Sequence, residues 1–405
     1  MIALCVFVFT YAVVAAGGIP GLRLDRTGAA LLGAALMVGL GVIGFGEAIA
    51  AIDFRTLALL TGMMIVVANL RLAGFFRLVA AWGLRHTHAP RTLLAAVVAV
   101  SGLLSALYVN DTVCLALTPL VLEVTGALRR NAAPYLLAVA MAANAGSVAT
   151  VTGNPQNMIA GSLSGIGFRE FAGAMAPVGV FSMAAVYVLI ELVYRGEFAK
   201  AVRVEPAPRR PRVHRALLAK SLAVSGALLA GFFAGLPLAE TALAGGALLL
   251  VTRRVKPEKV YRQMDWPLLV LFAGLFVVVR GVEKSPLTGE VFGWAAEAGL
   301  HRFGVLSAVS AVLSNLVSNV PAVLLFRPVA PALPDPQGAW LVVAMSSTLA
   351  GNLTILGSVA NLIVVERARK DGVVISFLEY ARIGVPLTVV TVVGGTLWLM
   401  WLRAV

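Results

Sequence analysis

The chain has 405 residues, of which 60% are hydrophobic and 13% are charged, and its mean hydropathy is +0.93. A soluble domain of this size could not hide so much apolar surface, and the apolar runs recur in blocks near the ~20 residues that cross a bilayer. The formal net charge of +13 lies in short loops between these blocks, where the cytoplasmic preference of Lys and Arg accounts for it. The composition predicts an all-α, polytopic membrane protein and excludes nucleic acid as an expected partner.

Three apolar spans come first, and placing Arg23 and Arg26 inside puts the N-terminus outside. The next apolar block, 92–125, is interrupted at its centre by the polar stretch YVNDT and is flanked by basic residues on both sides. Both ends are therefore expected in the cytoplasm. This predicts a re-entrant hairpin at about 92–126, with its tip at Asn110 and Asp111.

The following block, at about 134–165, carries the stretch VTGNPQNM in the middle of an apolar segment. Gly153 and Pro155 would break a helix there, and a broken helix is tolerated inside a bilayer only where it is buried in protein or lines a cavity. Asn154, Gln156 and Asn157 supply donors and acceptors to the freed backbone and to a ligand. The alternative is a kinked helix whose amides bond only to neighbouring helices.

A basic, proline-containing segment at 195–215 divides the chain into two halves and is predicted to be a cytoplasmic linker. The second half repeats motifs of the first. The stretch that begins at Asp53 returns at Asp265, and the stretch SALYVNDTVCLALTPLV returns as SNLVSNVPAVLLFRPVA. Gly153 and Asn157 correspond to Gly357 and Asn361, with the same spacing.

The basic flanks place these second copies in the opposite orientation, which predicts two inverted-topology repeats, 1–194 and 216–405. The second repeat has its own re-entrant hairpin at about 303–334 and its own broken helix at about 338–367. With about ten spans plus two hairpins, this organisation is typical of a secondary transporter whose site lies near the membrane midplane. The C-terminus is then expected outside.

Asp111 is the most informative single residue, because a carboxylate at the bilayer centre costs roughly 2.5–3.5 kcal/mol on insertion scales and normally faces water or a partner. In a partly dry site it could take up and release a proton during turnover. The alternative is a structural Asp that accepts bonds from backbone N–H groups at the tip. Asp53 and Asp265 stand at span entrances and are predicted to be helix N-caps.

The stretches NDTVCLALTPLVL, ANAGSVATVTGNPQN and GNLTILGSVANLIV resemble the ion transporter superfamily, most closely its arsenite-permease and P-protein branch. Citrate and sodium/dicarboxylate-sulfate transporters are more distant members. The resemblance implies a scaffold domain for homodimerisation and a mobile transport domain that moves like an elevator. This chain has Asn110-Asp111-Thr112 and Ser318-Asn319-Val320 where the dicarboxylate branch has Ser-Asn-Thr at both tips, which disfavours a sodium-dicarboxylate assignment.

The first functional hypothesis is a secondary transporter that exports a small inorganic oxyacid, with arsenite or antimonite favoured, and in which Asp111 carries the coupling proton. The residues expected to bind the solute lie at the two tips and the two breaks: Asn110, Thr112, Gly153, Asn154, Asn157, Ser318, Asn319, Asn352, Thr354, Gly357, Ser358 and Asn361. The sequence places no Arg or Lys near either loop, so an anion would depend on amides and helix N-termini.

Three alternatives stay open: a sodium- or proton-coupled transporter of sulfate, citrate or dicarboxylates, a sodium/proton antiporter, and, from another class, a membrane enzyme. Ser147 and Ser358 lack any His partner, so an enzyme is not expected. No cofactor and no metal site are expected, and the coupling ion is H⁺ or Na⁺. The expected partners are the solute, membrane lipid and a second copy of the chain in the inner membrane, with a soluble ATPase subunit if the protein is an arsenite pump.

Overall fold

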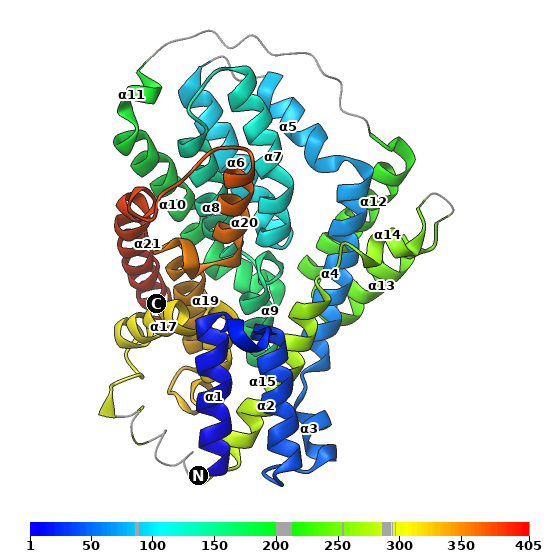
Figure 1. Cartoon of the computed structure of the whole chain (residues 1–405), viewed down its shortest axis with the longest axis vertical. Helices are drawn as coiled ribbons and strands as arrows, with labels where there is room; N and C mark the ends of the chain where they lie inside the picture. Colours follow the sequence, from blue (N-terminus) through cyan, green and yellow to red (C-terminus); the bar gives the residue numbers. More distant parts are fainter. Residues whose placement is uncertain are drawn as a thin grey trace.

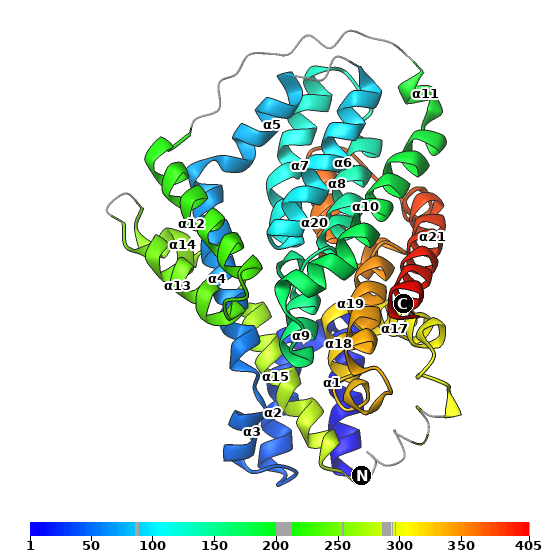
Figure 2. The same ribbon diagram turned by 180° about the vertical axis from the view of Figure 1, so that it is seen from behind.

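The computed structural model is almost entirely helical (Figures 1 and 2) and describes residues 1–85, 89–199, 213–252, 255–285 and 297–404, together with residues 293 and 295. Most of the predicted linker, residues 200–212, lies outside the described residues. The described strands are two short segments that pair antiparallel and join the first two helices, β1 (Gly18–Ile19) and β2 (Leu24–Asp25). The helical membrane-protein class predicted from the sequence is confirmed.

Six described helices are long and apolar enough to cross a membrane. They are α4 (Phe54–Ala73), α6 (Pro90–Leu107), α10 (Phe168–Val193), α12 (Arg215–Phe233), α15 (Trp266–Glu283) and α21 (Phe377–Ala404). Four apolar helices are shorter: α1 (Ile2–Ala16), α2 (Arg26–Gly39), α13 (Leu238–Leu250) and α17 (Phe303–Val317). The connecting elements are η1 (Pro20–Leu22), α3 (Phe45–Ala51), α5 (Phe75–Arg85), α11 (Arg195–Phe198), α14 (Pro257–Tyr261) and η3 (Ala330–Ala332).

Two helical hairpins interrupt the bundle. The first joins α6 to α7 (Asn110–Ala127), and the second joins α17 to α18 (Asn319–Leu325). The backbone of Tyr108 is extended between α6 and α7, so no continuous helix passes through Asn110. The second hairpin returns through a shorter helix than the first, because α18 ends at Leu325.

Two helices are broken near their centres. The first consists of α8 (Ala132–Ser147), η2 (Val151–Gly153) and α9 (Pro155–Ser164). The second consists of α19 (Pro336–Ala350), η4 (Ile355–Gly357) and α20 (Val359–Lys370). In Figure 1, α6, α7 and α8 occupy the upper half and α17 and α19 the lower half. The two hairpins therefore approach from opposite ends, as inverted repeats require.

Each hairpin packs on the broken helix of its own half and contacts the broken helix of the other half. Helices α6 and α7 lie against α8, and α17 and α18 lie against α19, while α7 also packs on α20 and α18 on α9. Small residues allow the closest approach: a Cβ at Gly146 would stand 2.1 Å from the carbonyl oxygen of Gly102. Such contacts between small residues are typical of helix packing in membranes.

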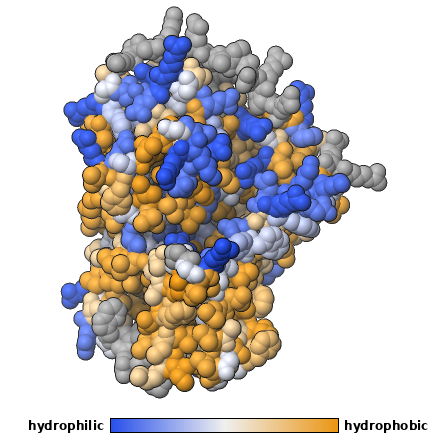
Figure 3. Space-filling model, viewed as in Figure 1, coloured by the Kyte–Doolittle hydropathy of each residue, from blue (hydrophilic) through white to orange (hydrophobic). Residues whose placement is uncertain are grey.

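The remaining helices form neighbouring packing groups. Helix α2 packs on α1 and α15, and α4 packs on α12 and α13. Figure 3 shows apolar residues over the lower part of one face of the molecule and hydrophilic residues gathered in its upper part. An apolar surface of this extent on a helical chain identifies a multi-pass membrane protein.

Candidate functional site

The two helix breaks are built in the same way. Asn157 Nδ2 donates to the carbonyl oxygens of Ser147 at 3.0 Å and Thr150 at 2.9 Å. Asn361 Nδ2 donates to those of Gly351 at 2.7 Å and Thr354 at 3.0 Å. The carbonyls of Ser147 and Gly351 lie at the end of the first half of each broken helix, where intrahelical partners run out. Those of Thr150 and Thr354 lie in the break itself and also accept from the backbone N–H groups of Gly153 and Gly357. One carboxamide therefore closes each break, at positions that correspond between the halves.

Each break begins its second half with a side-chain cap. Asn154 accepts from the backbone N–H of Asn157 at 2.8 Å, and Ser358 accepts from the backbone N–H of Ala360 at 3.2 Å. The breaks leave no room for a side chain at their glycines. A Cβ at Gly153 would stand 2.1 Å from the carbonyl oxygen of Ser147. Caps and glycines keep the unwound backbone satisfied at a depth where an unpaired group is costly.

Asn144 of α8 lies at the centre of the two halves. Its Nδ2 donates to Asn352 Oδ1 at 2.9 Å and to Asn361 Oδ1 at 3.1 Å. Its Oδ1 accepts from Asn110 Nδ2 at 3.0 Å and from the Ser358 hydroxyl at 3.1 Å. All four hydrogen-bonding positions of this carboxamide are used. Asn144 thereby ties the first hairpin tip to the second break.

Thr348 of α19 is the counterpart of Asn144. The pairs Asn144 and Thr348, and Asn157 and Asn361, are each 204 positions apart. The Thr348 hydroxyl lies 3.3 Å from Asn157 Oδ1 and accepts from Asn154 Nδ2 at 3.2 Å. The repeat seen in the sequence is therefore also a repeat of hydrogen-bond geometry.

The tip of the second hairpin is strained. Ser318 has φ 77° and ψ 156°, a region of backbone conformation that is essentially restricted to glycine. The Ser314 hydroxyl holds the adjacent Asn319 by donating to its Oδ1 at 2.7 Å. A non-glycine residue in this conformation costs on the order of 1–3 kcal/mol and is found where the surroundings impose it, often at ligand sites.

A cavity lies where the four interruptions meet, and its volume is about 520 Å³ including its open mouth. Five residues predicted from the sequence line it: Asn110, Asp111, Ser318, Asn319 and Ser358. Both tips and both breaks contribute to this wall. The other lining residues come from α1, α2, α9, α15, α18 and α20: Val14, Arg26, Pro155, Gln156, Leu268, Leu271, Val320, Pro321 and Val359.

Eight other predicted site residues do not line this cavity. They are Thr112, Gly153, Asn154, Asn157, Asn352, Thr354, Gly357 and Asn361, none of which belongs to the cavity lining. Asn154, Asn157, Asn352 and Asn361 are fully buried and bonded to protein groups. Their hydrogen bonds hold the backbone of the breaks, from which some of the lining residues project.

The structure adds residues that the sequence analysis did not place in the site. Arg26, the first residue of α2, lines the cavity, so the expectation of no Arg or Lys near the loops is wrong. Arg26 was assigned to a cytoplasmic loop because its position between two apolar spans fits the positive-inside rule. Asn144 was missed as well, although a lone carboxamide in a helix rich in Ala, Val and Met was a visible signal.

Asp111 supplies a carboxylate to the cavity from the first turn of α7. Within the described ranges no ion pair or side-chain hydrogen bond involves this carboxylate, and its backbone N–H donates to Asn110 Oδ1 at 2.9 Å. Asp265 is the N-cap of α15, one turn before Leu268, which lines the same cavity. The N-cap prediction for Asp53 and Asp265 is confirmed, because each accepts from backbone N–H groups at the start of its helix.

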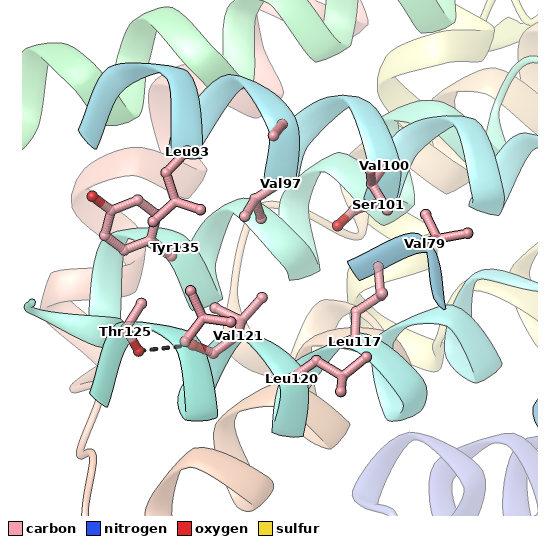
Figure 4. Close-up of a pocket in the computed structure, with 12 residues that line it drawn as sticks. Val79, Leu93, Val97, Val100, Ser101, Leu117, Leu120, Val121, Thr125 and Tyr135 are labelled. Carbon is pink, nitrogen blue, oxygen red and sulfur yellow. Dashed lines mark hydrogen bonds between the residues drawn. The ribbon is translucent and has the colours of Figure 1, made fainter. Parts of the chain in front are cut away.

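A second cavity lies between α5, α6, α7 and α8 (Figure 4). It is lined mainly by aliphatic side chains, including Val97, Leu117 and Val121. Its polar side chains are Ser101, Thr125 and Tyr135. A site of this composition does not offer the charged and amide groups that a polar solute needs, so the central cavity is the candidate solute site.

Three comparisons place the chain among known proteins. The family model described as citrate transporter (CitMHS) matches residues 7–345. An uncharacterized transporter of Mycobacterium tuberculosis is 33% identical and covers 100% of this chain and 98% of its own. The silicon efflux transporter LSI3 of Oryza sativa subsp. japonica is 32% identical, with 93% of each chain covered.

A putative transporter arsB of Dictyostelium discoideum is 25% identical, with 92% of this chain and 87% of its own covered. The solved structure of the Alcanivorax borkumensis YdaH transporter, described as having an unusual topology, matches with a TM-score of 0.65. That match covers 99% of this chain and 97% of the other at 16% identity, so it supports the fold alone. The chain belongs to the citrate transporter (CitMHS) family of secondary transporters, within the ion transporter superfamily.

Proposed function

We propose that this transporter exports a small inorganic oxyacid, with arsenite or antimonite as favoured solutes, in exchange for protons. The observation that carries the proposal is the central cavity, where one carboxylate, Asp111, stands among amide and hydroxyl groups from both hairpins and both breaks. A small polyhydroxy acid needs this mixture, because each of its O–H groups seeks an acceptor and each of its oxygens a donor.

The same carboxylate provides a mechanism for exchanging a proton for the solute. Ionised Asp111 accepts hydrogen bonds from the acidic O–H groups of the solute, and these charge-assisted bonds are stronger than neutral ones. Protonated Asp111 loses much of that acceptor strength and releases the solute. A site that holds either a proton or the solute, and reorients with one of them, exchanges the two. Among the described residues, the other charged side chain that lines the cavity with Asp111 is Arg26.

The relatives support this class of solute. One is a silicon efflux transporter and another carries the name arsB. Silicic acid and arsenous acid, the dissolved forms of silicon and arsenite at neutral pH, are both small, weakly acidic polyhydroxy compounds. A cavity with acceptors for O–H groups and donors for oxygens suits either.

Two alternatives use the same cavity. A citrate, dicarboxylate or sulfate transporter is favoured by the family description and by Arg26, which offers an anion a positive charge. A sodium/proton antiporter would bind the cation alone, with Asp111 and loop carbonyls as its ligands. The amides of Asn110, Asn319 and Gln156 would then lack a role in binding the transported ion, which disfavours this alternative.

The proposal includes an assembly and an orientation. The chain forms a homodimer in the inner membrane, with its termini outside and the linker cytoplasmic, and the hairpins and broken helices move together as an elevator. The remaining helices provide the fixed scaffold, because a moving domain needs a stationary partner. A soluble ATPase subunit would join only if the protein worked as an arsenite pump.

The test is uptake into everted membrane vesicles of arsenite, antimonite, sulfate, citrate and sodium, with and without an imposed pH gradient. The proposal expects arsenite or antimonite accumulation that depends on the gradient and disappears in vesicles without the protein. Uptake of sulfate or citrate alone would favour the anion transporter. Sodium movement with no oxyacid movement would favour the sodium/proton antiporter.

A further inference from the structure

Arg26 is the cationic side chain among the described residues that line the central cavity. It stands at the first position of α2, directly after the short β1–β2 turn. Helix α2 packs on α1 and α15, whereas Asn110 and Asp111 belong to α7, which packs on α8 and α20. The positive and negative charges of the cavity therefore come from different packing groups.

Helix stability does not explain an arginine at this position. The start of a helix carries a partial positive charge, so a cation there is unfavourable. Asp25, the residue before it, caps α2 by accepting from the backbone N–H of Gly28 at 2.7 Å. Within the described part of the chain, Arg26 has neither an ion pair nor a hydrogen bond from its side chain, although it is half-buried. A half-buried guanidinium without a protein partner has its donors available for a ligand.

We propose that Arg26 is a solute-binding residue that donates hydrogen bonds to the oxygens of oxyanions and oxyacids and disfavours the binding of inorganic cations. The inference rests on the proposed function and narrows its solute class to oxyanions and oxyacids bound through their oxygens. The planar guanidinium presents several N–H donors in a fixed arrangement that matches oxyanion geometry. A cation entering the same cavity would meet a fixed like charge.

Arg26 and Asp111 then divide the recognition of the solute between them. The guanidinium holds the oxygens that carry negative charge, and the carboxylate accepts from any O–H group that remains. A fully deprotonated anion such as sulfate uses Arg26 and the amides, and a partly protonated oxyacid uses both charged residues. The loss of Arg26 should therefore weaken the binding of charged anions most and the binding of uncharged arsenous acid least.

The experiment measures binding of sulfate, citrate and arsenite to the purified full chain in lipid nanodiscs by calorimetry. The variants are Arg26→Gln, Arg26→Lys and the matched control Arg23→Gln, which removes an exposed arginine of the same turn outside the cavity lining. We expect Arg26→Gln to lower the affinity for the anion that the wild type binds by about tenfold to a hundredfold. This is the range for loss of a charge-assisted hydrogen bond. Arg26→Lys should retain part of the affinity, and Arg23→Gln should bind like the wild type.

The outcomes separate this inference from the proposed function. If the wild type binds arsenite and an anion, and Arg26→Gln binds the anion equally well, the role of Arg26 is refuted while the proposed function stands. If the wild type binds none of the three probes, the proposed function fails and the inference fails with it. A Gln variant that does not fold is replaced by Arg26→Lys, for which unchanged affinity combined with new sodium binding would also overturn the proposal.

Discussion

Replacing Asn144 by Leu tests whether the hydrogen-bond network at the helix breaks supports the fold. The substitution keeps a side chain of similar length but removes two donors and two acceptors from a residue that is 1% exposed. Asn110 and Ser358, which donate to its Oδ1, line the cavity, so water can replace their lost partner. The other two partners, Asn352 and Asn361, are fully buried.

The loss of stability therefore comes mainly from the side-chain oxygens of Asn352 and Asn361, which would be left without a hydrogen-bond donor. Each buried acceptor left without a partner costs about 1–3 kcal/mol, so Asn144→Leu should lower the free energy of unfolding by about 2–6 kcal/mol. The assay is reversible unfolding in mixed detergent micelles. The matched control is Asn131→Ala, which removes the exposed cap of the same helix at the Ala133 N–H and should cost only about 1 kcal/mol. Equal destabilisation by the two variants would refute the idea that Asn144 holds the halves together.

Gly153→Ala should prevent folding or abolish transport, since its Cβ would stand 2.1 Å from a carbonyl oxygen, whereas Gly173→Ala, in open space on α10, should be neutral or slightly stabilising in a thermal melt. Ser318→Gly should be more stable than Ser318→Ala by about 1–3 kcal/mol, because only glycine relieves the strained backbone; equal stability would contradict the strain. Cross-linking in native membranes should give a dimer, and a monomer under the same conditions would argue against a scaffold that dimerises.

The helix breaks could be predicted from the sequence because their signals are local. Gly, Pro and three carboxamides inside an apolar block identify an interruption wherever they occur, and the return of Gly and Asn at the same spacing identifies its counterpart. The extent of the second hairpin was less visible. Its return helix ends at Leu325, and residues 330–332, which were expected within the hairpin, form a separate 3-10 turn.

The sequence could not predict which site residues line the cavity and which bond to the freed backbone. A carboxamide in a broken helix can bind either a solute or a freed carbonyl, and the composition is the same in both cases. Asn157 and Asn361 bond to the carbonyls behind them, whereas Asn110 and Asn319 line the cavity. Arg26 required tertiary information as well, because only the packing of α2 brings the start of this helix to the hairpin tips.

In the proposed mechanism, Asp111 couples proton movement to solute movement. The most direct measurement is arsenite flux into proteoliposomes driven by a pH gradient, for the wild type and Asp111→Asn, normalised to folded protein. Asp25→Asn serves as the control, because it changes an exposed carboxylate whose capping role an amide can fill.

Asparagine keeps the size and most hydrogen bonds of Asp111 but cannot titrate, and removal of an intramembrane charge should not impair insertion. Asp111→Asn is expected to lose flux driven by the gradient while solute exchange without net proton movement survives. The Asp25→Asn variant should behave like the wild type. Gradient-driven flux near the wild-type rate in Asp111→Asn would contradict a proton-carrying role for Asp111.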